Sequence, residues 1–196
     1  GLRSRDRTMP EEINRLVTDC LADLLLTPSP DGDENLLAEG VDPARIVQVG
    51  NIMIDALRHR FEHLAPSDIV ARLGLARDFG VVTLHRPSKV DEPAMLRGIV
   101  GALEEIGSEL PLVFPCHPRT RARLVQMPDP ARLLLTEPLG YLDFTELVRR
   151  SRLVLTDSGG LQEETTALGV PCVTLREPTE RPVTVERGTN TVVGSD

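Results

Sequence analysis

The chain has 196 residues, of which 40% are hydrophobic, so it is long enough to bury a substantial core. Its formal net charge is -8, from 22 Lys and Arg against 30 Asp and Glu, and no basic block interrupts the sequence, which argues against nucleic acid as a partner. No stretch reaches the roughly 18 uninterrupted apolar residues of a membrane span, and the first residues lack the apolar middle of a signal peptide, so we expect a cytoplasmic protein that does not enter the membrane.

Short apolar runs alternate with amphipathic segments along the chain. The predicted strands are 23–27, 45–49, 80–85, 111–115, 132–136, 152–157, 171–175 and 190–194, and the predicted helices are 10–19, 32–39, 51–63, 92–107, 118–126, 142–150, 159–168 and 182–187. The cluster PSPDGD at 28–33 predicts a turn. Most strands are continuous apolar runs, which is typical of a parallel sheet covered on both faces. The alternation predicts an α/β fold with right-handed crossovers and a doubly wound parallel sheet.

The first 50 residues contain only two of the predicted strands. A two-stranded sheet does not cover both of its faces by itself, so we expect 1–50 to be the remnant of one domain and 51–196 to form a second domain. The chain begins in a polar segment without an initiator Met, and we expect it to be part of a longer protein. Cys20, Cys116 and Cys172 are widely spaced and sit in apolar runs, which predicts buried thiols in a reducing compartment and no metal site.

The segment LVLTDSGGLQEE, residues 153–164, passes from a strand directly into a helix through Ser158, Gly159 and Gly160. In an open parallel sheet, a helix that starts at the carboxyl end of a strand directs free backbone N–H groups into the ligand crevice. Glycine lets a phosphate approach that backbone closely, and an acidic side chain such as Glu163 or Glu164 could accept hydrogen bonds from ribose hydroxyls, as acidic side chains do in other nucleotide sites. The pattern is also compatible with an ordinary capped helix whose first turn is acidic.

Charged side chains follow three further predicted strands, at the corners where the chain leaves each strand. His85 and Arg86 come after 80–85, His117 begins a segment with several arginines after 111–115, and Arg176 and Arg181 lie in a loop after 171–175. Arginine at such positions suits phosphate, although solvated surface arginines would give the same sequence. Because the carboxyl ends of parallel strands meet at one edge, the corners together predict a cleft for a phosphorylated ligand.

Seven segments in order resemble the non-hydrolysing UDP-N-acetylglucosamine 2-epimerase family. They read PEEINR, VGNIMIDAL, TLHRPSKVD, FPCHPRTRARL, LGYLDFTELV, LTDSGGLQEETTALGVPCVTLREPTERP and GTNTVVGSD, and they extend over nearly the whole chain. The resemblance implies a glycosyltransferase-B-like architecture, in which two Rossmann-like domains face each other and the C-terminal one holds UDP. It implies that this chain carries that C-terminal domain without its closing helices, a role in cell-surface polysaccharide biosynthesis, a homodimer for the full-length enzyme, and no cofactor.

The resemblance also implies roles for individual residues. Ser158, Gly159 and Gly160 match the diphosphate site, Glu164 the ribose ligand, and Phe144 the backbone contact for uracil. His85 matches the active-site histidine and Glu11 a catalytic carboxylate; Arg15 and Arg181 match arginines of the substrate site. His117 matches a histidine that lines a regulatory sugar-nucleotide site in some bacterial members. After His85, family members often read Arg-x-Glu-Asn where this chain reads Arg-Pro-Ser-Lys, so the contacts of this loop are expected to differ.

The chemistry implied is the interconversion of UDP-N-acetylglucosamine and UDP-N-acetylmannosamine. The C2 proton of the sugar is not acidic, and such enzymes are understood to eliminate UDP across C1–C2 and add it back after reprotonation on the other face. We expect these 196 residues alone to bind UDP without catalysing the reaction. Two alternatives stay open: a glycosyltransferase of the same fold, which would need an acceptor, and a nucleotide-binding remnant without catalysis.

Overall fold

The computed structural model describes residues 1–75, 78–124, 132–177 and 179–194. In chain order the elements are α1 (Pro10–Leu21), β1 (Leu25–Thr27), α2 (Pro30–Ala38), the 3-10 turn η1 (Pro43–Arg45), β2 (Ile46–Gln48), α3 (Ile52–His63), α4 (Ile69–Arg72), β3 (Gly80–Thr83), α5 (Pro87–Val90), α6 (Pro93–Gly107), β4 (Leu112–Pro115), α7 (Pro118–Leu124), β5 (Leu133–Thr136), α8 (Tyr141–Arg150), β6 (Leu153–Thr156), α9 (Gly159–Leu168), β7 (Cys172–Thr174), α10 (Pro182–Glu186) and β8 (Asn190–Val192).

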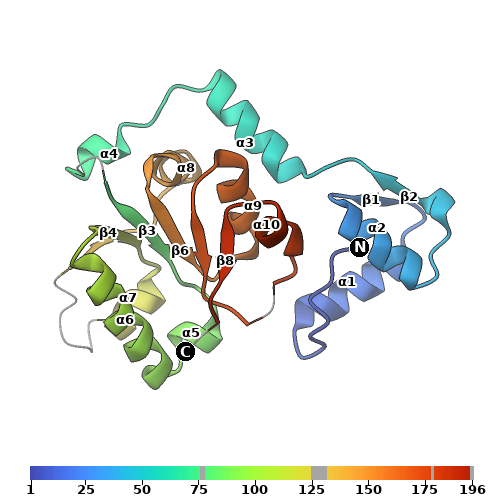
Figure 1. The fold of residues 1–196 in the computed structure, drawn as a ribbon, viewed down its shortest axis with the longest axis horizontal. Coiled ribbons are helices and arrows are strands. Elements are labelled where there is room, and N and C mark those ends of the chain that lie inside the picture. Colours follow the sequence, from blue (N-terminus) through green and yellow to red (C-terminus); the bar gives the residue numbers. More distant parts are fainter. Residues whose placement is uncertain (76–77, 125–131, 178, 195–196) are drawn as a thin grey trace.

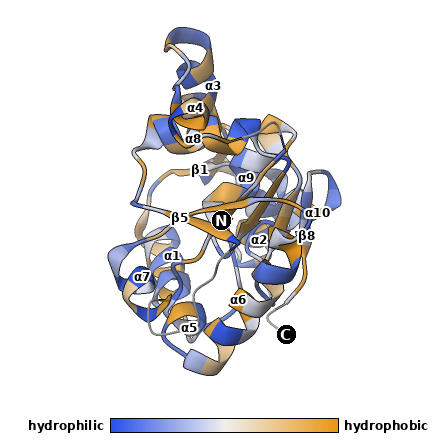
Figure 2. Cartoon of the chain, turned by 90° about the vertical axis from the view of Figure 1, so that its left-hand side faces the viewer, coloured by the Kyte–Doolittle hydropathy of each residue, from blue (hydrophilic) through white to orange (hydrophobic). Residues whose placement is uncertain are grey.

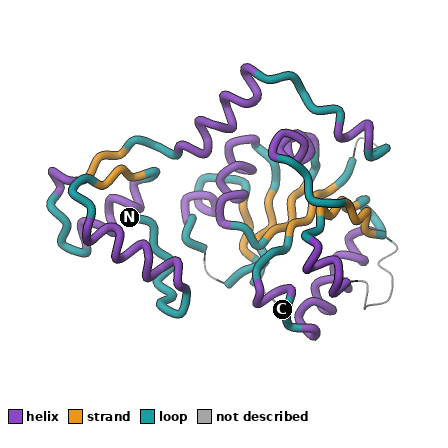
Figure 3. The backbone as a smooth tube through the Cα atoms, turned by 180° about the vertical axis from the view of Figure 1, so that it is seen from behind, coloured by secondary structure: helices purple, strands orange, loops and turns teal. Residues whose placement is uncertain are grey.

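The strands form two separate parallel sheets (Figures 1 and 3). β1 and β2 pair with each other in the N-terminal unit, which we define as residues 1–49. The larger sheet has the strand order β5-β4-β3-β6-β7-β8, and every described pairing in it is parallel. Counted from β3, this is the doubly wound 3-2-1-4-5-6 order of Rossmann-like domains. The predicted α/β class and doubly wound sheet are confirmed.

Two hydrophobic clusters cover the two faces of the larger sheet. One contains Val82 and Phe114 together with side chains of α6, and the other contains Val81 and Val113 together with side chains of α8 and α9. Neighbouring residues of one strand therefore point to opposite faces, as the pleat requires. Figure 2 shows the hydrophobic strands enclosed between helices. Burial on both faces explains why the strands are continuous apolar runs rather than alternating ones.

The N-terminal unit buries much less. Leu25 and Leu36 are buried, but Leu26 is 60% exposed and Val47 is 43% exposed. The small sheet thus leaves some of its apolar side chains largely exposed in the described structure. Division of the chain into domains at residue 50 remains a prediction.

Local expectations differ from the structure at several points. The predicted turn at 28–33 is wrong, because α2 begins at Pro30; proline at the first helical position starts a helix as readily as a turn. The short helices α4 and α5 were not predicted, since four residues are too few to show a period. Cys116 and Cys172 are buried free thiols as predicted, whereas the prediction is wrong for Cys20, which lies on α1 and is exposed. The end of the predicted helix 118–126 lies outside the described residues.

Candidate functional site

The site lies where the chain changes direction across the sheet. β3 and β6 are neighbours at its centre, in a register that pairs Thr83 with Thr156, yet they are far apart in sequence. β4 and β5 extend the sheet from β3 in one direction, while β7 and β8 extend it from β6 in the other. The loops after β3 and β6 therefore part from each other and leave a crevice, which is the usual ligand position in doubly wound sheets.

The start of α9 presents unpaired backbone donors at this crevice. Ser158 is the N-cap residue, and among the described residues its side chain makes no capping hydrogen bond, so its hydroxyl is available. The Ser158 amide donates to Thr156 Oγ1 at 3.0 Å, which fixes the entry of the chain into the helix. The first turn of α9 thus combines free N–H groups with the positive end of the helix dipole, and both favour an anion.

The two glycines after Ser158 have different surroundings. A Cβ placed on Gly159 would lie 2.5 Å from Glu180 Oε1, so this glycine makes room for a carboxylate of the protein itself. A Cβ placed on Gly160 would have no described atom within 4 Å, and Gly160 is exposed. Of the two, Gly160 is therefore the one that leaves open space for a ligand beside the helix.

A cavity of about 480 Å³ opens at this point. Its described lining includes His85 after β3, His117 after β4, Phe144 of α8, and Ser158, Gly160 and Glu164 of the β6–α9 corner. The remaining lining residues are Met53, Thr83, Leu84, Pro115, Pro138, Leu139, Tyr141 and Leu161. The structure thus brings six of the predicted site residues to one cavity, with polar groups converging on a partly apolar wall.

His85 is held by a buried carboxylate. Asp157 is fully buried, and its Oδ1 lies 2.6 Å from His85 Nδ1. Its Oδ2 accepts hydrogen bonds from the backbone amides of His85 at 3.0 Å and Arg86 at 2.9 Å. Hydrogen bonding to Asp157 raises the pKa of His85 above its usual 6.5. Burial raises the pKa of Asp157, but the hydrogen bonds from His85 and Arg86 outweigh it and the net pKa is lowered.

The other end of the cavity offers a carboxylate next to apolar side chains. Glu164 is 8% exposed, and its burial, with the nearby charge of Glu163, raises the pKa of its carboxyl group. Tyr141 and Phe144, both on α8, line the same cavity. A poorly solvated carboxylate beside an apolar wall suits a ligand that has hydroxyl groups next to a flat ring.

Other predicted residues lie outside the described lining of this cavity. Glu11 is exposed on α1, and Arg15 bonds to Glu12 through two nitrogens at 2.7 and 3.0 Å. Arg181 pairs with Glu163 at 3.0 Å instead of facing the cavity. Their assigned roles remain predictions.

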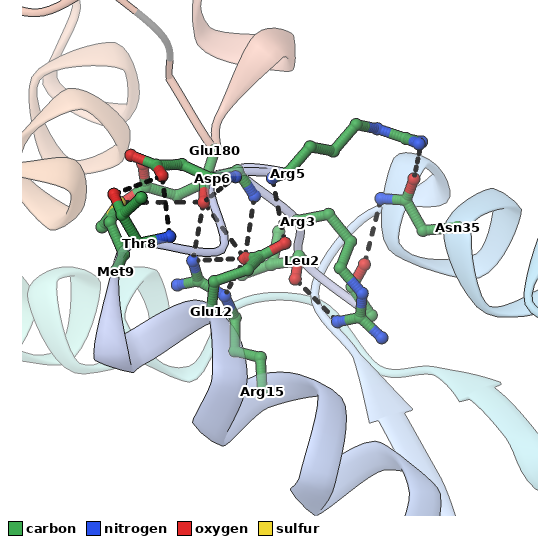
Figure 4. A network of polar contacts seen from close by, with 12 residues as sticks. Leu2, Arg3, Arg5, Asp6, Thr8, Met9, Glu12, Arg15, Asn35 and Glu180 are labelled. Carbon is green, nitrogen blue, oxygen red and sulfur yellow. Dashed lines mark hydrogen bonds and ion pairs between the residues drawn. The ribbon is translucent and has the colours of Figure 1, made fainter.

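The neighbouring carboxylates of PEEINR are in different environments. Glu12 is buried and accepts hydrogen bonds from the amides of Ser4 at 3.0 Å and Arg5 at 2.9 Å, and Figure 4 shows it facing the segment that precedes α1. Burial raises the pKa of Glu12, but the bonds from Ser4, Arg15 and Arg5 together lower it to about 2. Glu12 is thus engaged within the protein, whereas the adjacent Glu11 is exposed.

Sequence reasoning missed Asp157 and Glu180, and it offered Arg176 as a phosphate ligand, whereas the structure pairs Arg176 with Glu180. The last two form a buried ion pair of 2.8 Å that packs against Gly159. Asp157 is part of the quoted DSGG segment, and an aspartate directly after a buried strand is a signal that could have singled it out. The contribution of Glu180 depends on contacts that no spacing in the sequence reveals.

The rest of the molecule offers weaker candidates. A hollow of about 560 Å³ between α6 and the sheet is lined mainly by apolar side chains such as Met95, Ile99 and Leu175. In the described ranges, no three His, Cys, Asp or Glu side chains are grouped so as to hold a metal ion, and no described helix is long and apolar enough to cross a membrane.

The chain is similar to known proteins that are described as 2-epimerases of UDP-sugars. The model of a family described as UDP-N-acetylglucosamine 2-epimerase matches residues 1–196. The UDP-N-acetylglucosamine 2-epimerase of Methanocaldococcus jannaschii is 40% identical over 208 residues, covering 100% of this chain and 57% of the relative. The UDP-2,3-diacetamido-2,3-dideoxy-D-glucuronate 2-epimerase of Pseudomonas aeruginosa is 43% identical over 200 residues, covering 100% of this chain and 55% of the relative.

Among solved structures, the Methanocaldococcus jannaschii UDP-GlcNAc 2-epimerase in complex with UDP-GlcNAc and UDP matches with a TM-score of 0.89. The identity is 40%, and the match covers 100% of this chain and 57% of that one. The chain therefore spans little more than half the length of these relatives.

Proposed function

The chain belongs to the UDP-N-acetylglucosamine 2-epimerase family, and from that membership we propose that the described site binds the UDP part of a UDP-sugar. Because the chain spans about 57% of the Methanocaldococcus jannaschii relative, epimerisation is proposed for the whole protein and UDP binding for these residues. The observation that carries the proposal is the cavity that joins Ser158, Gly160, His85 and Glu164 at the switch point of the sheet.

Each part of UDP has a matching group in the cavity. The diphosphate would accept hydrogen bonds from the free amides of α9 and the Ser158 hydroxyl, next to the imidazole of His85. Glu164 would accept hydrogen bonds from the ribose hydroxyls, and the wall that contains Phe144 would take the uracil. We keep Gly159 as a supporting residue of this corner, because its open side is taken by Glu180.

The reaction proposed for the whole protein needs stabilisation of a leaving diphosphate. Positive potential from the amino end of α9 and from a protonated His85 would act on the oxygens on which negative charge develops as UDP departs. Glu11 and Arg15 are proposed to contribute a proton-transferring carboxylate and a cation from α1. The exposure of Glu11 is compatible with this role, whereas the carboxylate of Glu12 accepts a hydrogen bond from the backbone amide of Arg5.

The names of the relatives suggest two candidates for the sugar of the substrate. UDP-N-acetylglucosamine is our first candidate, and a UDP-2,3-diacetamido-2,3-dideoxy-D-glucuronate is the second, because its epimerase has 43% identity to this chain. The groups proposed here bind UDP, which both candidates contain. A homodimer, a location in the cytoplasm, a regulatory role of His117 and a substrate contact of Arg181 remain predictions.

Calorimetry with UDP tests the binding proposal. Ser158→Ala and Glu164→Gln should each lower the affinity for UDP about tenfold, which is the usual loss when a hydrogen bond to a charged group is removed. Ser108→Ala is the matched control, because Ser108 is exposed at the end of α6 and its hydroxyl donates to Glu105 O. No heat with UDP, or equal affinity in all three variants, would show that the cavity is not the UDP site.

Activity is tested with the whole protein and each UDP-sugar alone. Epimerisation at C2, followed by NMR without an acceptor, is the expected outcome. Turnover only in the presence of an acceptor would point to a glycosyltransferase, and UDP binding without turnover to a nucleotide-binding module.

A further inference from the structure

Asp157 is the one carboxylate of the described site that lies completely inside the protein. Its exposure is 0%, and all its described partners belong to the β3–α5 corner or to the ends of β3 and β6. A buried carboxylate is unfavourable unless it is hydrogen-bonded, and this one accepts from two backbone amides and one imidazole nitrogen.

We propose that Asp157 is a positioning residue, which holds the imidazole of His85 with Nδ1–H toward the protein interior and leaves Nε2 for the anion in the cavity. His85 Nδ1 lies 2.6 Å from Asp157 Oδ1, and the His85 side chain as a whole is 61% exposed. Only one nitrogen of His85 therefore faces the carboxylate. A hydrogen-bonded carboxylate selects the imidazole tautomer and its orientation, as it does in Ser-His-Asp triads.

Backbone contacts make the arrangement rigid. The Asp157 carbonyl accepts from Arg86 Nε at 3.0 Å, and the Asp157 amide donates to Thr83 O at 3.4 Å. Thr83 and Thr156 are joined through their hydroxyls at 2.7 Å. The carboxylate, the ring and both strand ends thus form one unit, so His85 is presented in a defined direction before a ligand arrives.

The same contact favours a protonated His85. Hydrogen bonding to Asp157 raises the pKa of His85, whereas burial and the charges of Arg86 and Arg176 lower it, and the net pKa is raised. With Asp157 in place the imidazolium can donate Nε2–H to an anionic oxygen. The proposal rests on the proposed function only for the identity of that anion as a diphosphate.

NMR of 15N-labelled histidines tests the positioning without any ligand. In the unaltered chain, neutral His85 should carry its hydrogen on Nδ1. In Asp157→Asn the carboxamide N–H₂ faces Nδ1, so the hydrogen should move to Nε2 and the titration of His85 should shift to lower pH. Asp143→Asn is the matched control, since Asp143 accepts from Ser67 and Arg72 outside the cavity lining.

Absence of a hydrogen on Nδ1 of neutral His85 in the unaltered chain would overturn the proposal, and this result does not require that any Asp157 variant folds. A titration of His85 that is unchanged in folded Asp157→Asn would overturn it as well. The variant His85→Ala assigns the signals.

Calorimetry with UDP separates positioning from a structural role. Asp157→Asn should lower the affinity for UDP about tenfold at pH 7, and this loss of affinity should become smaller at lower pH as His85 regains its proton. In a His85→Ala background the same substitution should lower the affinity for UDP little further, because Asp157 affects UDP binding through the imidazole of His85. Equal losses in both backgrounds would show that Asp157 only supports the loop. If unaltered chain does not bind UDP, the proposed function fails, while the tautomer measurement still decides the role of Asp157.

Discussion

Glutamine in place of Glu12 should destabilise the start of α1 strongly at neutral pH. The carboxylate accepts from two backbone amides and from Arg15, and its pKa is lowered from 4.5 to about 2. A difference of that size corresponds to about 3 kcal/mol between the charged and the neutral side chain at neutral pH. Because glutamine has the shape of the neutral acid but only one acceptor oxygen, Glu12→Gln should lose most of this stabilisation.

Hydrogen exchange of a peptide from α1 measures the effect locally. About 3 kcal/mol corresponds to a loss of protection of the order of a hundredfold at pH 7. Glu11→Gln is the matched control, since the adjacent Glu11 is exposed, and its effect should stay within about 0.5 kcal/mol.

The pH dependence gives a second test. A carboxyl group with a lowered pKa stabilises the folded state fully above its unfolded value of 4.5, and the contribution is lost as the pH falls toward about 2. The difference between unaltered chain and Glu12→Gln should therefore be constant from pH 7 to about 5 and then shrink. A difference that does not change down to pH 3, or equal protection of both variants at pH 7, would refute the reasoning.

Three substitutions and one chemical modification test the local structure further. Gly159→Ala should lower the stability in urea unfolding by about 1–3 kcal/mol, because the new Cβ would lie 2.5 Å from a buried carboxylate oxygen, whereas Gly160→Ala should leave stability unchanged and weaken UDP binding. Gly169→Ala should cost about 1 kcal/mol in the same assay, since this C-cap residue has φ of 70°. Iodoacetamide at neutral pH should label exposed Cys20 quickly, while buried Cys116, whose pKa is raised to about 11 by burial, should react only after unfolding, as mass spectrometry of peptides would show.

Much of the fold could be predicted because local signals agreed with tertiary structure. All eight predicted strands are present, and most are shorter than predicted. In the six-stranded sheet, burial on both faces imposes continuous apolar runs. The helix after Ser158 was predicted from Gly159 to Leu168 and has these bounds, ended by Gly169 in the left-handed conformation. Proline and aspartate near Pro30 led to the wrong prediction of a turn, because both residue types are common in turns and at the starts of helices.

The candidate site was predicted only in part. Strand ends marked His85, His117 and Ser158, and parallel topology alone was enough to place them on one edge of the sheet. Spacing did not distinguish Glu11 from Glu12, because adjacent helical residues differ only in the direction of their side chains.

Sequence by itself determined the strands, their parallel arrangement and the residue types at the crevice, because these follow from apolar periodicity and from the glycines and polar residues that end each run. Only the tertiary structure decided that Asp157 holds His85, that Glu180 fills the space beside Gly159 and that Gly160 stays open. These contacts join residues up to 72 positions apart, so they depend on how two strands lie side by side and not on any local pattern.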